Sequence, residues 1–151
     1  MSEPTADREI AALSARHLRF GWALVFAYVL LGLALEAMHA FKLGVYLDVS
    51  NETRRLMWTL AHTHGTLIGV LNLAFSLTVA RLVLSASELG WCSRLLRWAG
   101  LLMPLGFLLG GVVVYGGDPG PGVVLAPIGG LCLVAGVGLA ALGGWRAGRE
   151  S

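Results

Sequence analysis

The stretch Val123 to Leu142, VVLAPIGGLCLVAGVGLAAL, contains no charged residue. Its 20 residues would form a helix about 30 Å long, which is long enough to cross the hydrocarbon core of a bilayer. The stretch therefore predicts a membrane-spanning helix. The whole chain agrees, because only 13% of its 151 residues are charged, whereas soluble domains contain about 25%.

Three further apolar runs precede this stretch, and polar or turn-forming segments separate them. They cover Leu18 to Phe41, Leu56 to Leu84, and Leu95 to Tyr115. Each run is long enough to span a bilayer as a helix. We expect an all-α fold, an integral membrane four-helix bundle with four transmembrane helices in up-down-up-down order, forming a single domain over residues 1–151.

The segment between the last two spans is rich in glycine and proline. Pro119 suits the second position of a tight turn, and Gly120 accepts the positive φ that a type II turn needs at its third position. The sequence therefore predicts a type II turn at Pro119 and Gly120, and a tight helical hairpin around it.

Basic residues predict the orientation, because cytoplasmic segments carry an excess of lysine and arginine. With four spans, both termini lie on one side of the membrane. Eight basic residues fall on the terminal side: Arg8, Arg16, Arg19, Arg81, Arg94, Arg97, Arg146 and Arg149. Three fall on the other side: Lys42, Arg54 and Arg55. We expect a multi-pass protein of the cytoplasmic (inner) membrane with cytoplasmic N- and C-termini.

The residues before the first span suggest a further element. Ile10, Leu13, His17 and Phe20 recur at helical spacing, which predicts an interfacial helix that lies along the membrane surface before the chain turns inward. On this interpretation His17 is a solvated or interfacial side chain.

Small residues four positions apart predict close helix packing, since helices in lipid approach where side chains are small. The pairs are Gly65 and Gly69, Gly106 and Gly110, Ala126 and Gly130, and Cys132 and Gly136. Cys92 and Cys132 are expected at different depths, so we predict unpaired thiols.

Ionisable side chains inside spans are costly and indicate function by default. Glu36 and His39 lie three residues apart near the outer end of the first span, on one helix face. His62 and His64 lie near the outer start of the second span. Counting residues around the hairpin places all four at one depth, so we expect Glu36, His39, His62 and His64 to converge. His62 and His64 are about 200° apart on a helix, however, so only one of them points to a given spot unless the helix is distorted.

Carboxylate and imidazole together suit iron, manganese or zinc. The sequence predicts a site for a metal ion (Fe, Cu, Mn or Zn) with Glu36, His39, His62 and His64 as ligands. Copper would draw on Met38 or Met57. Haem b is the second candidate cofactor, with axial ligands drawn from His39, His62 and His64. A redox or metal-handling role follows from either cofactor.

Other interpretations remain open. The Glu/His group could be a hydrogen-bonded network that fixes helix register, a proton relay, or a quinone-type pocket with Glu36 as proton carrier. The chain would then be a non-catalytic small subunit or assembly factor of a larger membrane complex. A small channel would require a water-lined path past Asn72 and Ser76. The expected partners are the lipid bilayer and either further copies of the chain or a membrane complex. No basic run suited to nucleic acid is present.

Overall fold

The computed structural model of the chain describes residues 3–48 and 52–150. Four long helices make up most of it: α1 (Glu3–Ala40), α3 (Glu52–Thr78), α4 (Ala86–Val112) and α5 (Leu125–Glu150). Each of the four is long and apolar enough to cross a membrane. The predicted all-α fold with four candidate spans is therefore confirmed.

Short elements join the long helices. The helix α2 (Gly44–Leu47) lies between α1 and α3, and the 3-10 turn η1 (Val79–Arg81) follows α3. The strands β1 (Val114–Tyr115) and β2 (Asp118–Pro119) and the 3-10 turn η2 (Pro121–Val124) link α4 to α5. Ser85 begins α4 with a capping box, in which its hydroxyl accepts from the Glu88 amide and the Glu88 carboxylate accepts from the Ser85 amide. The helix thus starts ahead of the predicted span Leu95 to Tyr115.

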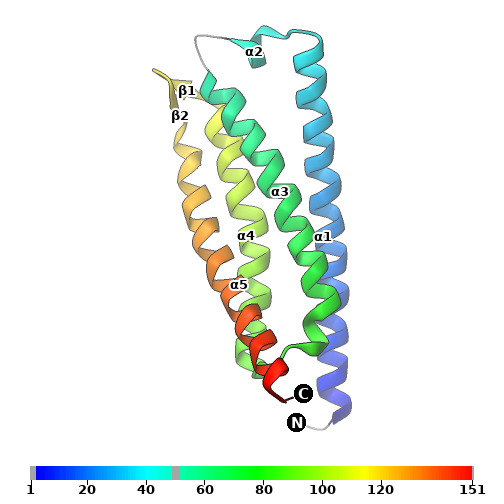
Figure 1. The fold of residues 1–151 in the computed structure, drawn as a ribbon. Coiled ribbons are helices and arrows are strands. Elements are labelled where there is room, and N and C mark those ends of the chain that lie inside the picture. Colours follow the sequence, from blue (N-terminus) through cyan, green and yellow to red (C-terminus); the bar gives the residue numbers. More distant parts are fainter. Residues whose placement is uncertain (1–2, 49–51, 151) are drawn as a thin grey trace.

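The long helices alternate in direction, and both termini lie at the same end of the molecule (Figure 1). Each long helix packs mainly on the next along the chain: α1 on α3, α3 on α4, and α4 on α5. The helix α1 also touches α4, but over a much shorter stretch. Within the described residues, α1 and α5 share no more than isolated contacts. The helices therefore form an up-and-down row more than a closed four-sided bundle.

Glycines allow the backbones of α1 and α3 to approach closely. A Cβ at Gly21 would come within 2.9 Å of the Gly69 carbonyl oxygen, and one at Gly69 within 3.1 Å of the Gly21 carbonyl oxygen. One turn earlier in α3, a Cβ at Gly65 would overlap the ring of Tyr28. Gly65 and Gly69 were predicted at a close helix crossing, and the structure confirms this. Gly130, predicted in the same way on α5, is not at a close crossing, because a Cβ there would meet nothing within 4 Å.

The α1 helix runs unbroken from Glu3 to Ala40, so the prediction of a separate interfacial helix before the first span is wrong. The reason is packing at the terminal end. Ile10 packs against a core cluster of Phe75, Val79, Cys92 and Leu96. One turn later, the Ser14 hydroxyl donates to the Ser76 carbonyl oxygen over 2.8 Å. These contacts hold the start of α1 on α3 and α4.

The turn between α4 and α5 also differs from its prediction. β1 and β2 pair antiparallel, with Val114 opposite Pro119 and Tyr115 opposite Asp118. The positive φ angles are at Gly116 (59°) and Gly117 (90°), whereas Gly120 has a φ of −63°. The predicted type II turn at Pro119 and Gly120 is therefore wrong. Two adjacent glycines supply both positive φ angles of a two-residue hairpin, at lower steric cost.

The glycine packing makes a prediction about stability. Gly65→Ala should destabilise the protein by about 1–3 kcal/mol, because the new methyl group overlaps the buried Tyr28 ring. Gly130→Ala is the matched control, because a Cβ there meets nothing within 4 Å, and alanine is the better helix former. Thermal unfolding in detergent measures both. Equal unfolding temperatures for the two variants would contradict close packing at Gly65.

Candidate functional site

A cleft opens at the end of the molecule far from the termini, between α1, α2 and α3; we call it the distal cleft. Its volume is about 340 Å³, and its polar lining comprises Glu36, Tyr46, Thr59 and His62. Its remaining lining is Val29, Gly32, Leu33 and Leu35. A carboxyl group and an imidazole thus share one largely apolar cleft.

The orientation of His62 is fixed by α1. Its Nδ1 lies 2.6 Å from the Tyr28 carbonyl oxygen, and since a carbonyl only accepts, Nδ1 carries the hydrogen. The other nitrogen, Nε2, then has a free lone pair in the neutral ring. Gly32 provides the room for this arrangement, because a Cβ there would overlap the imidazole.

His64 lies in a different environment. Its Nδ1 donates to the Leu60 carbonyl oxygen one turn earlier in α3, over 2.9 Å. Its ring lies 5.0 Å from the ring of Phe107 on α4, measured between centroids. His62 therefore packs on α1 and His64 on α4, as their angular separation of about 200° requires.

The remaining predicted residues lie on the exposed side of α1. Glu36 and His39 are both exposed, and the His39 ring lies 6.5 Å from the Tyr46 ring between centroids. Among the residues that the structure describes, no group of three or more His, Cys, Asp or Glu side chains could hold a metal ion. The structure thus brings Glu36 and His62 to one cleft, but does not bring all four predicted ligands together. Counting residues around the hairpin predicts only how deep each of the four residues lies. The rotation of each helix about its axis decides where the side chains point, and it keeps the four side chains from meeting at one place.

Arg54 secures the segment that carries Tyr46. Its Nε donates to the Gly111 carbonyl oxygen over 3.0 Å, and one terminal nitrogen donates to the Val45 carbonyl oxygen over 3.2 Å. Arg54 thereby links α2, α3 and α4 at the distal end. Its neighbour Arg55 forms an exposed ion pair with Glu52.

A second polar group, missed by the sequence analysis, lies toward the terminal end. His17 is fully buried, with an exposed fraction of 0%. Its Nδ1 lies 2.7 Å from the Asn72 side-chain oxygen, and its Nε2 lies 2.8 Å from the Ser93 hydroxyl. The prediction that His17 is solvated or interfacial is therefore wrong. The burial of His17 could have been predicted from its helical spacing from Ile10 and Leu13, because that spacing places His17 on the packed face of α1.

Hydrogen-bond partners fix the protonation of this group. The Asn72 amide nitrogen donates to the Ile68 carbonyl oxygen over 2.8 Å, so the Asn72 oxygen accepts from His17 Nδ1. His17 Nε2 then accepts the Ser93 hydroxyl proton. The neutral imidazole is satisfied at both nitrogens and joins α1, α3 and α4. A fully satisfied buried group of this kind specifies helix packing.

The polar group around His17 and the distal cleft differ in whether a histidine nitrogen remains available to bind a ligand. The His17 group has no ring nitrogen available for a ligand, whereas His62 has one ring nitrogen without a hydrogen-bond partner among the described residues and lines a cleft that Glu36 also lines. The distal cleft is therefore the candidate site. No family model, no curated protein and no solved structure matches the chain in the comparisons with known proteins.

The buried group makes a prediction. Asn72→Ala should destabilise the protein by about 1–3 kcal/mol, because it leaves a buried imidazole N–H without a partner. Thr63→Ala is the control in the same helix, since the exposed Thr63 hydroxyl bonds only to the Thr59 carbonyl oxygen one turn before. Unfolding in detergent, followed by circular dichroism, compares the two. A smaller loss for Asn72→Ala than for Thr63→Ala would refute the packing role.

Proposed function

We propose that the chain is a multi-pass protein of the cytoplasmic membrane, with both termini in the cytoplasm, and that its distal cleft binds a transition-metal ion in a redox or metal-handling role. Four apolar helices and termini at one end support the topology. The excess of arginine on the terminal side supports the orientation. The cleft then opens at the outer face of the membrane.

One observation carries the metal proposal: the Nδ1–H of His62 is donated to a backbone carbonyl, and its other nitrogen is free in the cleft that Glu36 lines. Metal-binding histidines almost always donate their second ring nitrogen in this way, which fixes the tautomer and the ring orientation. An imidazole with a carboxylate suits iron, manganese or zinc better than calcium or magnesium.

The proposed metal site would leave coordination positions for other ligands, because the cleft supplies only two of the four predicted ligands. Glu36 and His62 would bind the ion, and water or a small substrate would take further positions. His39, one turn after Glu36 and next to Tyr46, is the nearest predicted residue to add as a third ligand. His64 is excluded from this site by its packing on Phe107.

Haem b fits less well within one chain. Axial ligation by two histidines cannot draw on His62 and His64 together, because these pack on different neighbouring helices. A haem would therefore need His39 with His62 or His64, a single axial histidine, or a histidine from a second copy of the chain.

A second candidate function is proton exchange in a small non-catalytic subunit or assembly factor. It is favoured by the finding that, over the described parts of the chain, no third metal-ligating side chain joins Glu36 and His62. Both side chains bind and release protons, and an ionisable pair in a membrane protein suits a relay. On this second proposal, the chain would assemble with further copies of itself or with a larger membrane complex.

The metal proposal predicts metal content. Protein purified in mild detergent without chelators should carry close to one iron, copper, manganese or zinc ion per chain by elemental mass spectrometry. His62→Ala and Glu36→Gln should each lower the affinity for the metal at least about tenfold, because loss of a group that only orients a ligand already costs about 10–100-fold. Each variant should therefore retain clearly less metal than wild type. His64→Ala is the matched control and should keep the metal.

Two results would contradict the metal proposal. One is equal metal content in wild type and His62→Ala, and the other is no metal in wild type after incubation with each ion. The absorption spectrum distinguishes haem from a bare ion, because haem absorbs strongly in the visible range. Metal loss in His64→Ala but not in His62→Ala would move the site to the α3–α4 contact.

A further inference from the structure

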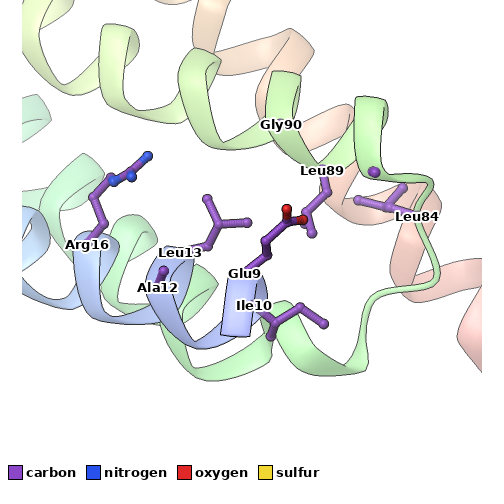
Figure 2. Close-up of a pocket in the computed structure, with 9 residues that line it drawn as sticks. Glu9, Ile10, Ala12, Leu13, Arg16, Leu84, Leu89 and Gly90 are labelled. Carbon is purple, nitrogen blue, oxygen red and sulfur yellow. The ribbon is translucent and has the colours of Figure 1, made fainter. Parts of the chain in front are cut away.

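Two neighbouring pockets lie between α1 and α4 at the terminal end; together we call them the α1–α4 groove. Its first part is a pocket of about 380 Å³, lined by residues that include Glu9, Leu13, Arg16 and Leu89 (Figure 2). Its second part is a pocket of about 200 Å³, lined by Phe20, Arg94, Arg97, Trp98 and Leu101.

The two pockets continue along the same helix faces. Phe20 lies four residues after Arg16 on α1, and Arg94 lies four residues after Gly90 on α4, so each pair shares a face. The groove exists because α1 packs extensively on α3 but touches α4 only over a short stretch. One of those touching points is the bond between His17 and Ser93.

Three arginines line the groove. The Nε of Arg97 is buried and has no hydrogen-bond partner. The Arg94 guanidinium lies 4.2 Å from the centroid of the Trp91 ring, which holds it by a cation–π contact. Figure 2 shows the Arg16 side chain extending from α1 toward α4. The groove therefore gathers positive charge.

No ion pair between these arginines and an acidic group is found among the side chains that the structure describes. The ion pairs found in the described parts of the chain join Arg55 to Glu52 and Arg146 to Glu88. Glu9 is the acidic residue of the groove, and it lies two helical turns before Arg16, beside Leu89 (Figure 2). The arginines thus retain their capacity to bind an anion.

The arginines lie near the edge of the hydrocarbon core, from which their long side chains can reach the level of the lipid phosphates. About 20 helical residues cross the hydrocarbon core, and counting back from Val112 at the distal end of α4 reaches Ser93. The same count from Ala40 on α1 reaches Gly21. By this count Arg94 lies just inside the edge of the hydrocarbon core, Arg97 lies about one turn deeper, and Leu101 lies deeper still. On α1, Phe20 lies at the edge of the core and Arg16 lies about one turn outside it.

We propose that the α1–α4 groove binds the phosphate group of an anionic phospholipid. The guanidinium groups of Arg94 and Arg97, which line one pocket, would hold the phosphate, since arginine forms paired, charge-assisted hydrogen bonds with phosphate oxygens. Arg16 would add positive charge from the adjacent pocket. An acyl chain would lie along Phe20 and Leu101. Basic pockets between transmembrane helices on the cytoplasmic side bind anionic lipid headgroups in this way. The groove lies at the opposite end of the molecule from the distal cleft, so this lipid site is independent of the proposed metal site.

The test is lipid binding by the full chain after removal of bound lipid. Native mass spectrometry in mild detergent would follow titration with phosphatidylglycerol, with phosphatidylcholine as the zwitterionic comparison. Wild type should bind phosphatidylglycerol in preference. The double variant Arg94→Gln, Arg97→Gln should weaken that binding by about tenfold or more, as expected for lost charge-assisted bonds.

The control double variant is Arg81→Gln, Arg149→Gln, which removes the same charge from the same end but outside the groove. It should bind phosphatidylglycerol nearly as well as wild type. Equal losses in the two double variants, or no loss in the groove variant, would overturn the proposal. Displacement of the lipid by millimolar inorganic phosphate would also overturn it, because the site would then take free phosphate.

Milder single variants test whether a loss of lipid binding comes from the lost contact or from misfolding. Arg97→Lys keeps the charge but replaces the planar fork with a point charge, so it should fold and bind phosphatidylglycerol severalfold more weakly. Gel filtration and circular dichroism check the fold of each variant. Unchanged affinity in Arg97→Lys and in a folded Arg94→Gln variant would also refute the site.

Discussion

The close approach of α1 to α3 is the constraint on which the rest of the structure depends. Gly21 and Gly69 let the two backbones come nearly into contact, and Gly65 receives the ring of Tyr28. Because little hydrophobic drive acts between helices in lipid, such contacts supply much of the association. They also set the rotation of both helices. His62 reaches the Tyr28 carbonyl oxygen past Gly32, and His17 reaches Asn72, only in this relative position.

The two histidine sites show how burial separates structural from chemical roles. His17 is enclosed by three helices and satisfied at both ring nitrogens, as an unpaired polar group in a membrane interior would be costly. His62 is satisfied at one nitrogen and lines a cleft with the other free. A ring nitrogen without a partner, in a cleft that a carboxyl group also lines, is what distinguishes the candidate site from a packing contact.

The row of helices explains where ligands have access. A closed bundle would cover both sides of α1, whereas here α1 packs chiefly on α3. One consequence is the distal cleft, which α2 and α3 border beside Glu36. The other is the groove toward α4, where Arg97 keeps a buried nitrogen without a partner. Arg54 closes the distal end by bonding to backbone carbonyls of neighbouring elements.

The sequence by itself determined the four apolar helices, the small residues at their crossings, and the opposite orientations of His62 and His64, because hydropathy and helical periodicity are local properties. It also placed Glu36 and His62 at one level. Only the tertiary structure decided that Glu36 and His62 share a cleft while His64 turns to Phe107. The burial of His17 and the turn at Gly116 and Gly117 were likewise decided there. The rotation of one helix against another follows from side chains that meet across the interface, and no single helix encodes it.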